Sequence, residues 1–178
     1  MTQVATVGGE LRRPDTGESG LVRLEPCLDS HFAALLSGFA PTDNLRLPEG
    51  ELEETVVLEY LRVLTAELRV YFAVGTWLIV VQDELVGFCS YKGAPNPDGD
   101  VEIGYGIAAS RRDRGYATSA VAQIIRETRR YANVRALTAE TAIGNTASGR
   151  VLEKNGFLKV GTRRDEEEGE LFRWRREL

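Results

Sequence analysis

Hydrophobic residues recur at two spacings along the chain, and each spacing is typical of one kind of secondary structure. Apolar residues three and four positions apart mark one buried face of a helix, whereas short continuous or alternating apolar runs mark strands. The first spacing predicts four helices, at 29–39, 51–68, 115–132 and 145–155. The second predicts seven strands, at 21–24, 77–81, 85–91, 101–108, 136–141, 157–161 and 170–175.

The order of these elements predicts an α/β fold, with a mixed β-sheet and helices on both of its faces. Three strands form a meander between residues 77 and 108, and a helical crossover leads to the next strand. The last two strands are expected to pair antiparallel across the acidic turn 165–169. Residues 1–19 are low in apolar content and predict a flexible N-terminal tail, so a single domain is expected over residues 20–178.

Polar residues indicate where the first two helices begin. Asp29 or Ser30 is expected to cap the first helix. Glu51, Glu53 and Glu54 are expected to open the second, because the positive end of a helix dipole favours carboxylates. The buried face of this second helix is expected to consist of Val57, Tyr60, Leu61, Leu64 and Leu68.

The net charge and the apolar runs argue against several classes of protein. The 22 basic and 27 acidic residues give a net charge of −5, which argues against broad binding to nucleic acid or to an anionic membrane. No basic start followed by an apolar stretch opens the chain, which predicts no signal peptide. The longest uncharged apolar-rich run, 70–81, is too short to span a bilayer.

The cysteine and histidine content predicts no metal site and a cytoplasmic protein. Cys27 and Cys89 lack the spacing of metal ligands, and His31 is the single histidine of the chain. So few cysteines fit a reducing compartment. We expect His31 to be structural or solvent-facing and Cys89, Trp77 and Trp174 to be packing residues.

The strongest chemical signal is the loop that leads into the third predicted helix. The first turn of a helix has free backbone N–H groups, and with the helix dipole they favour a phosphate or pyrophosphate. Gly115 and the small Ala117 would let the backbone approach such an anion closely. Arg112 and Arg114 can add positive charge, and Thr118 can add a hydroxyl group.

A dinucleotide-binding site is a competing interpretation of the same region. Gly104, Gly106 and Ala109 match the pattern G-x-G-x-x-A after a strand, which would indicate a nucleotide-dependent oxidoreductase. In that fingerprint the glycine turn opens directly into a helix, but here the polar segment 110–114 intervenes. The two glycines fit a bulge or a close backbone approach within a strand better. The chain has no P-loop pattern.

Two motifs resemble those of a known superfamily. The pattern Arg112-x-x-Gly115-x-Ala117 resembles the Q/R-x-x-G-x-G/A signature of the GCN5-related N-acetyltransferases (GNAT). The segment 145–157, with Ser148 and Leu152, is similar to a second motif of that superfamily, in the branch that includes the ribosomal-protein alanine acetyltransferases. The resemblance covers the chain from residue 21 to its end.

The resemblance implies a single-domain GNAT-like fold whose sheet splays between strands 101–108 and 136–141, with acetyl-CoA bound in the gap as cosubstrate and no metal. It implies backbone contacts from Ile107 and Ala108 to the pantetheine arm. Asn145 and Ser148 would face the cofactor near its thiol. The resemblance assigns the pyrophosphate to Arg112, Asp113, Arg114, Gly115, Tyr116, Ala117 and Thr118.

Transfer of an acetyl group to an amine sets further requirements. At pH 7 the deprotonation of an alkyl ammonium costs roughly 4–5 kcal/mol, so a base or a water chain must take the proton. Glu102 is the candidate base, with a solvent-facing strand carboxylate as the alternative. The free N–H of Ile107 is the family's usual donor to the oxyanion. Many relatives have a tyrosine acid where this chain has Leu152, so Ser148 is the main candidate that protonates the departing thiolate, directly or through water. Tyr116 and Tyr105 are secondary candidates, and a thiolate can also leave without help.

The sequence therefore predicts an N-acetyltransferase in which a primary amine attacks acetyl-CoA directly in a ternary complex. The acceptor is either a protein N-terminus or a small amine, and neither nucleic acid nor a membrane is expected as partner. Relatives often pair through the sheet edge, which makes a homodimer an assembly to consider. The alternative is a catalytically silent domain that senses CoA or acyl-CoA. Whether acetyl or a longer acyl group is carried stays open at this stage.

Overall fold

The computed structural model describes residues 21–178, so the tail predicted for 1–19 lies outside the described residues. Four α-helices are present in this part of the chain, namely α1 Asp29–Leu36, α2 Thr55–Leu68, α3 Tyr116–Thr128 and α4 Thr146–Lys154. A short 3-10 helix covers Ala109–Arg111. The strands are β1 Val22–Pro26, β2 Thr76–Val81, β3 Glu84–Tyr91, β4 Asp100–Ile107, β5 Ala136–Ala142, β6 Leu158–Asp165 and β7 Gly169–Glu177.

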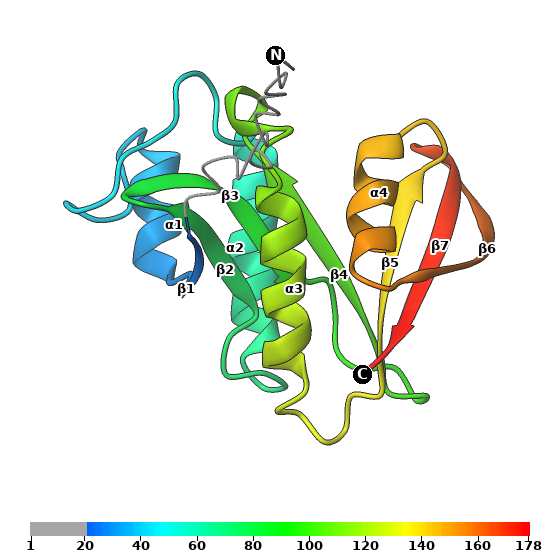
Figure 1. The fold of residues 1–178 in the computed structure, drawn as a ribbon. Coiled ribbons are helices and arrows are strands. Elements are labelled where there is room, and N and C mark those ends of the chain that lie inside the picture. Colours follow the sequence, from blue (N-terminus) through cyan, green and yellow to red (C-terminus); the bar gives the residue numbers. More distant parts are fainter. Residues whose placement is uncertain (1–20) are drawn as a thin grey trace, which may run out of the picture.

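The strands form one mixed sheet in the order β1-β2-β3-β4-β5-β7-β6 (Figure 1). Strands β1 to β4 are an antiparallel meander. Strands β4 and β5 are parallel, and they pair only from Asp100–Ala136 to Glu102–Thr138. The predicted mixed α/β fold is confirmed, as is the antiparallel pairing of β6 with β7. The position of β7, between β5 and β6, was not predicted.

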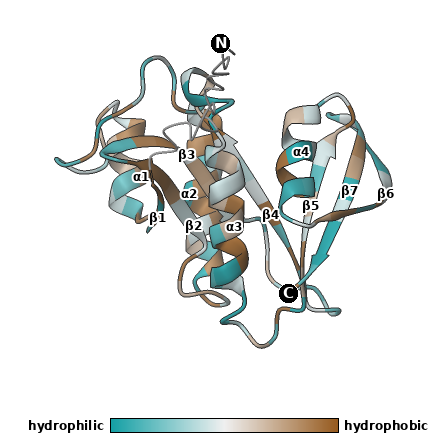
Figure 2. Cartoon of the chain, in the orientation of Figure 1, coloured by the Kyte–Doolittle hydropathy of each residue, from teal (hydrophilic) through white to brown (hydrophobic). Residues whose placement is uncertain are grey.

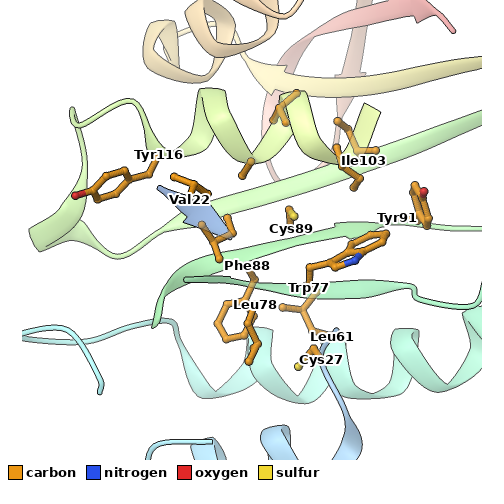
Figure 3. Close-up of a cluster of buried hydrophobic side chains, with 14 of the residues drawn as sticks. Val22, Cys27, Leu61, Trp77, Leu78, Phe88, Cys89, Tyr91, Ile103 and Tyr116 are labelled. Carbon is orange, nitrogen blue, oxygen red and sulfur yellow. The ribbon is translucent and has the colours of Figure 1, made fainter. Parts of the chain in front are cut away.

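Helices cover both faces of the sheet, with α3 and α4 in front and α2 behind in the view of Figure 1. Every residue of β2 is buried, and the apolar positions of the meander lie in the middle of the molecule (Figure 2). Leu78 and Phe88 point toward α2, whereas Cys89 and Ile103 point toward α3 (Figure 3). Cys89, Trp77 and Trp174 are buried, as the sequence predicted.

Strands β3 and β4 approach each other unusually closely. A Cβ on Gly87 would lie 2.0 Å from the carbonyl oxygen of Gly106, so only glycine fits at residue 87. This contact agrees with the close backbone approach that the sequence predicted around Gly106.

The predicted caps of α1 are wrong. The N-cap residue is Leu28, and both Asp29 and Ser30 lie inside the helix. The backbone N–H of Leu28 donates a hydrogen bond to Nδ1 of His31 at 3.3 Å. The histidine side chain therefore satisfies a polar group at the helix start, in agreement with the structural role expected for it.

The second helix begins at Thr55 rather than at Glu51, which corrects its predicted start and its buried face. Leu52 packs against the core and holds the preceding residues as a loop. The face that packs on the sheet includes Leu58 and Thr65, so Tyr60 lies toward solvent and is 52% exposed. The buried residues of α2 are Leu58, Leu61, Leu64, Thr65 and Leu68.

The third helix ends at Thr128, four residues before its predicted end. The ring of Tyr131 packs edge-on against Phe72, with 5.1 Å between the ring centroids. Its hydroxyl group also accepts a hydrogen bond from the backbone N–H of Ala73 at 3.0 Å. These tertiary contacts draw the chain away from the helix axis, which explains the early end.

Candidate active site

The parallel strands β4 and β5 separate beyond Glu102, and the side of β4 next to this gap carries free backbone donors. Ala108 donates its N–H to Val86 at 2.9 Å, and the carbonyl of Glu102 accepts from Lys92 at 2.8 Å, so even-numbered residues of β4 face β3. In an antiparallel ladder the intervening residues face the other way. The N–H groups of Tyr105 and Ile107 therefore face the gap, whereas that of Ala108 is already bonded.

The loop between β4 and α3 carries a row of free backbone donors. Gly115 is the N-cap of α3 and has a left-handed backbone with φ of 78°, and Asp113 is left-handed as well with φ of 62°. The first hydrogen bond of the helix runs from Ser119 N–H to Gly115 at 3.1 Å. No main-chain partner occurs in residues 21–178 for the N–H groups of Gly115, Tyr116, Ala117 and Thr118. Such donors at a positive helix end suit an anion.

The arginines of this loop differ in what they can bind. Arg111 donates two hydrogen bonds to the Glu84 carboxylate, from Nε at 2.7 Å and from Nη2 at 2.9 Å. Its guanidinium group is therefore part of a structural ion pair. Arg112 turns back and donates from Nε to the Ile107 carbonyl at 3.1 Å, which places it at the end of β4. Arg114 is exposed and makes no ion pair within the described part of the chain. Arg112 and Arg114 are thus the side chains of this loop that are free to meet an anion.

The other wall of the gap is the start of α4. Asn145 is the N-cap, and its Oδ1 accepts a hydrogen bond from the backbone N–H of Ser148 at 3.0 Å. The carbonyl of Ser148 accepts from the Tyr105 hydroxyl at 3.0 Å, so one bond joins β4 directly to α4. Burial raises the pKa of Tyr105 to about 12. Leu152, where many relatives have a tyrosine, is fully buried.

The sequence pointed to Ser148 but not to the partner that reaches it from β4. The motif identifies residues close together in the chain, whereas Tyr105 lies 43 positions away from Ser148. A tyrosine in an apolar strand gave no signal that distinguished a bridging role from packing.

Glu102, the candidate base, lies at the end of β4 where the sheet is still paired. Its carboxylate binds Nζ of Lys92 at 2.6 Å. Both side chains line a cavity of about 340 Å³ together with Thr138, Glu140 and Arg173. Glu140 in turn binds Arg163 at 2.6 Å, which lowers the pKa of the Glu140 carboxyl. The structure therefore places Glu102 in a charged cavity, away from the row of donors at the other end of β4.

A second carboxylate, which the sequence did not indicate, lies on the same face of β4. A Cβ on Gly106 would lie 3.1 Å from Oε2 of Glu53, so this carboxylate lies directly over the strand. Glu53 belongs to the loop before α2 and is half-buried. From the sequence, Glu53 was expected to open the second helix, and no local pattern relates it to Gly106.

The arrangement has the form of an anion site beside a splayed sheet, and the family comparison agrees with it. A model of the acetyltransferase (GNAT) domain matches residues 22–158. The chain belongs to the GNAT acetyltransferase family. The uncharacterized N-acetyltransferase YjdG of Bacillus subtilis is 34% identical to this GNAT chain over 85 residues, which are 47% of this chain and 51% of the relative. The chain spans about half the length of the curated relatives that it matches.

Solved structures show the same fold in other acetyltransferases of the GNAT type. One is RimL, a ribosomal L7/L12 alpha-N-protein acetyltransferase in complex with coenzyme A. The two structures match with a TM-score of 0.68 at 18% identity, and the match covers 91% of this chain and 97% of the RimL chain. RimJ of Mycobacterium smegmatis in complex with CoA-disulfide has a TM-score of 0.65 at 20% identity and covers 89% and 82%. The family predicted from the two motifs is confirmed.

None of the helices described in the structure is long and apolar enough to cross a membrane. Within residues 21–178 no group of three His, Cys, Asp or Glu side chains is arranged to hold a metal ion.

Proposed function

We propose that this protein transfers the acetyl group of acetyl-CoA to a primary amine, with the gap between β4 and β5 as its active site. The observation that carries the proposal is the row of unbonded N–H groups from Gly115 to Thr118, beside a gap into which Tyr105 and Ile107 also point N–H groups. A Cβ on Gly115 would meet nothing within 4 Å, so space is open in front of these donors. The pyrophosphate of acetyl-CoA fits this position by charge and by hydrogen bonding.

The residues of the loop and of α4 then take distinct roles. The backbone from Arg112 to Thr118 holds the pyrophosphate, and the guanidinium groups of Arg112 and Arg114 add positive charge. Ile107 donates its N–H to the carbonyl oxygen that gains negative charge during transfer. Asn145 fixes the start of α4, so that Ser148 lies beside the gap. Bound acetyl-CoA supplies the thioester that the amine attacks.

The hydroxyl group of Ser148 is the proposed source of the proton for the departing thiolate. Its neighbour Leu152 offers no acidic group, and the Tyr105 hydroxyl is engaged with the Ser148 carbonyl. A thiolate leaves readily without help, since a free thiol has a pKa of about 8.5. Replacement of Ser148 by alanine is therefore expected to lower kcat only modestly.

A protein N-terminus and a small amine are both compatible with the site. RimL, named above, is an acetyltransferase of a protein N-terminus, and a second structure with this fold, the microcin C7 self-immunity protein MccE, is described in complex with acetyl-CoA and AMP. The net charge of −5 favours the approach of a cationic acceptor of either kind.

The test is an assay of thiol release from acetyl-CoA with a panel of small amines and of short peptides with free N-termini. Release that depends on an amine, together with acetylated product in the mass spectrum, supports the proposal. Binding of acetyl-CoA with no release against any amine would instead support the sensor alternative, because the cofactor site would then exist without turnover.

A further inference from the structure

Glu53 lies where a proton acceptor for the incoming amine is needed, on the face of β4 opposite α3. Its Oε1 accepts a hydrogen bond from the backbone N–H of Glu54 at 3.2 Å. Its Oε2 faces Gly106, at 3.1 Å from the position of a Cβ on that residue. Glu53 is half-buried and makes no ion pair with any residue between 21 and 178, so Oε2 has no charged partner of its own.

The loop that carries Glu53 is fixed onto the sheet at several points. Arg46 donates its N–H to Asp83 at 2.7 Å and accepts from Leu85 at 2.9 Å, so it forms a bridge beside the β2–β3 turn. The Ser110 hydroxyl donates to the Glu49 carbonyl at 2.6 Å and ties the loop to the segment after β4. Leu52 packs against the core. These contacts hold the Glu53 carboxylate over Gly106 before any substrate binds.

Glu53 Oε2 lies close enough to the Ile107 N–H, the proposed oxyanion donor, for both groups to contact the same reacting atoms. The Ile107 nitrogen follows Gly106 in the chain, so covalent geometry places it within about 7 Å of Glu53 Oε2. An amine hydrogen-bonded to Oε2 and a carbonyl oxygen bonded to the Ile107 N–H fit within that span. Gly106 has no side chain, which leaves room for this approach from the side of α2.

Glu102 is poorly placed for the same task. It lies five residues before Ile107 on an extended strand, so about 16 Å separates their Cα atoms. Its carboxylate is also bound to Lys92 at 2.6 Å, on the rim of the charged cavity. A proton could pass from an amine near Ile107 to Glu102 only along a chain of several waters, whereas Glu53 lies beside the reacting centre.

We infer that Glu53 is the general base, and that the acceptor is an alkyl primary amine that arrives as a cation. This inference rests on the proposed function. The ammonium group of the acceptor binds Oε2 and gives it one proton, and the freed electron pair forms the N–C bond to the thioester carbonyl carbon. The C–S bond then breaks, and the thiolate takes its electron pair. The Ser148 hydroxyl gives its proton to the thiolate and takes the second proton of the nitrogen in return, and Glu53 returns its proton to water.

The experiment compares Glu53→Gln with wild type, using 1,4-diaminobutane and a short peptide with a free N-terminal serine as acceptors. General-base catalysis contributes about 100-fold or more, so kcat/KM at pH 7 is expected to fall by about that factor. The affinity for acetyl-CoA, measured by calorimetry, is expected to stay unchanged. The variant should regain activity as pH rises, because the acceptor then loses its proton to the solvent. Hydroxylamine is uncharged at neutral pH, so its acetylation should suffer least.

Three variants make the comparison specific. Glu51→Gln removes an exposed carboxylate from the same loop and should leave the rate unchanged. Gly106→Ala adds a methyl group 3.1 Å from Oε2, so it should shift the carboxylate by a few tenths of an ångström and lower the rate less than Glu53→Gln does. Glu102→Gln is expected to keep most of the activity.

The possible failures are distinguishable. A Glu53→Gln variant with the rate and pH profile of wild type, or a large loss confined to Glu102→Gln, would overturn this inference and leave the proposed function standing. A folded wild-type protein that binds no acetyl-CoA or acetylates none of the acceptors would overturn both.

Discussion

Gly115 illustrates how one residue determines the geometry of the proposed pyrophosphate site. Its φ of 78° lies in the left-handed region, where a residue with a Cβ is strained. Only two residues before it, Asp113 is left-handed too, with φ of 62°. Left-handed residues of this kind occur in the loops whose backbone N–H groups form anion-binding nests.

Replacement of Gly115 by alanine should therefore destabilise the protein by about 1 kcal/mol, through backbone strain alone. Gly93→Ala is the matched control, since a Cβ at either position meets nothing within 4 Å and only Gly115 has a positive φ. Urea unfolding should show the loss for Gly115→Ala and little change for the control. Equal midpoints for the two variants would contradict the assignment of strain to residue 115.

Tyr105 is a second residue with a testable contribution, since its hydroxyl joins β4 to α4 at 3.0 Å. Tyr105→Phe should lower the free energy of unfolding at pH 7 by about 1 kcal/mol, the usual value of one such hydrogen bond. Burial raises the pKa of Tyr105 from 10.0 to about 12, so the folded state holds the proton more tightly than the unfolded state. The stabilisation is therefore complete below pH 10 and is lost as the pH rises toward 12.

The difference in urea midpoint between wild type and Tyr105→Phe should accordingly shrink between pH 10 and pH 12. Burial also raises the pKa of Cys27 and of Tyr91, so alkali lowers the stability of the protein through these groups as well. That loss is the same in wild type and in Tyr105→Phe, so it does not affect the difference between them. A difference that stays constant over this range would show that the hydroxyl is not held as described.

The parts of the site that could be predicted from the sequence are those formed by residues close together in the chain. The segment 112–118 and Asn145 with Ser148 could be identified because each motif is local, and their binding roles are still proposals. The hydrogen bond from Tyr105 to Ser148 and the approach of Glu53 to Gly106 depend on tertiary structure. Nothing in the spacing of these residues indicates that they meet.

The ends of the helices likewise depend partly on local sequence and partly on tertiary contacts. The helix predicted over 145–155 begins at Thr146, and its N-cap Asn145 accepts the hydrogen bond from Ser148 that is typical of a capping asparagine. The start of α2 was placed four residues early, because three glutamates fit a helix start while Leu52 is in fact held in a loop by the core. For α1 and α2, therefore, neither a candidate cap nor local charge in the sequence located the helix start.

The cap of α4 gives a direct prediction. Asn145→Ala removes the acceptor of the Ser148 N–H and should cost about 1 kcal/mol of stability. Asn145→Asp keeps an acceptor oxygen and should remain close to wild type. Thermal melts of the three proteins test this order, and an alanine variant as stable as the aspartate variant would show that the cap contributes little.

The whole molecule is organised around a sheet that opens in its middle. Strands β1 to β4 form one half, β5 to β7 the other, and three residue pairs between β4 and β5 connect them. Arg175 of β7 binds Asp100 of β4 at 2.8 Å and secures the closed end of the gap. The mixed sheet and the crossover were predictable from element order, but the insertion of β7 was not, since strand order depends on which edges remain free after folding.

Acetyl-CoA binding tests the central claim, that the gap and the loop before α3 form a site for this cosubstrate. Isothermal titration of the folded protein with acetyl-CoA, with NAD as the control nucleotide, is the most direct measurement. We expect saturable binding of acetyl-CoA that weakens in Gly115→Ala, and none of NAD. A folded protein that binds no acetyl-CoA, or that prefers NAD, would contradict the account.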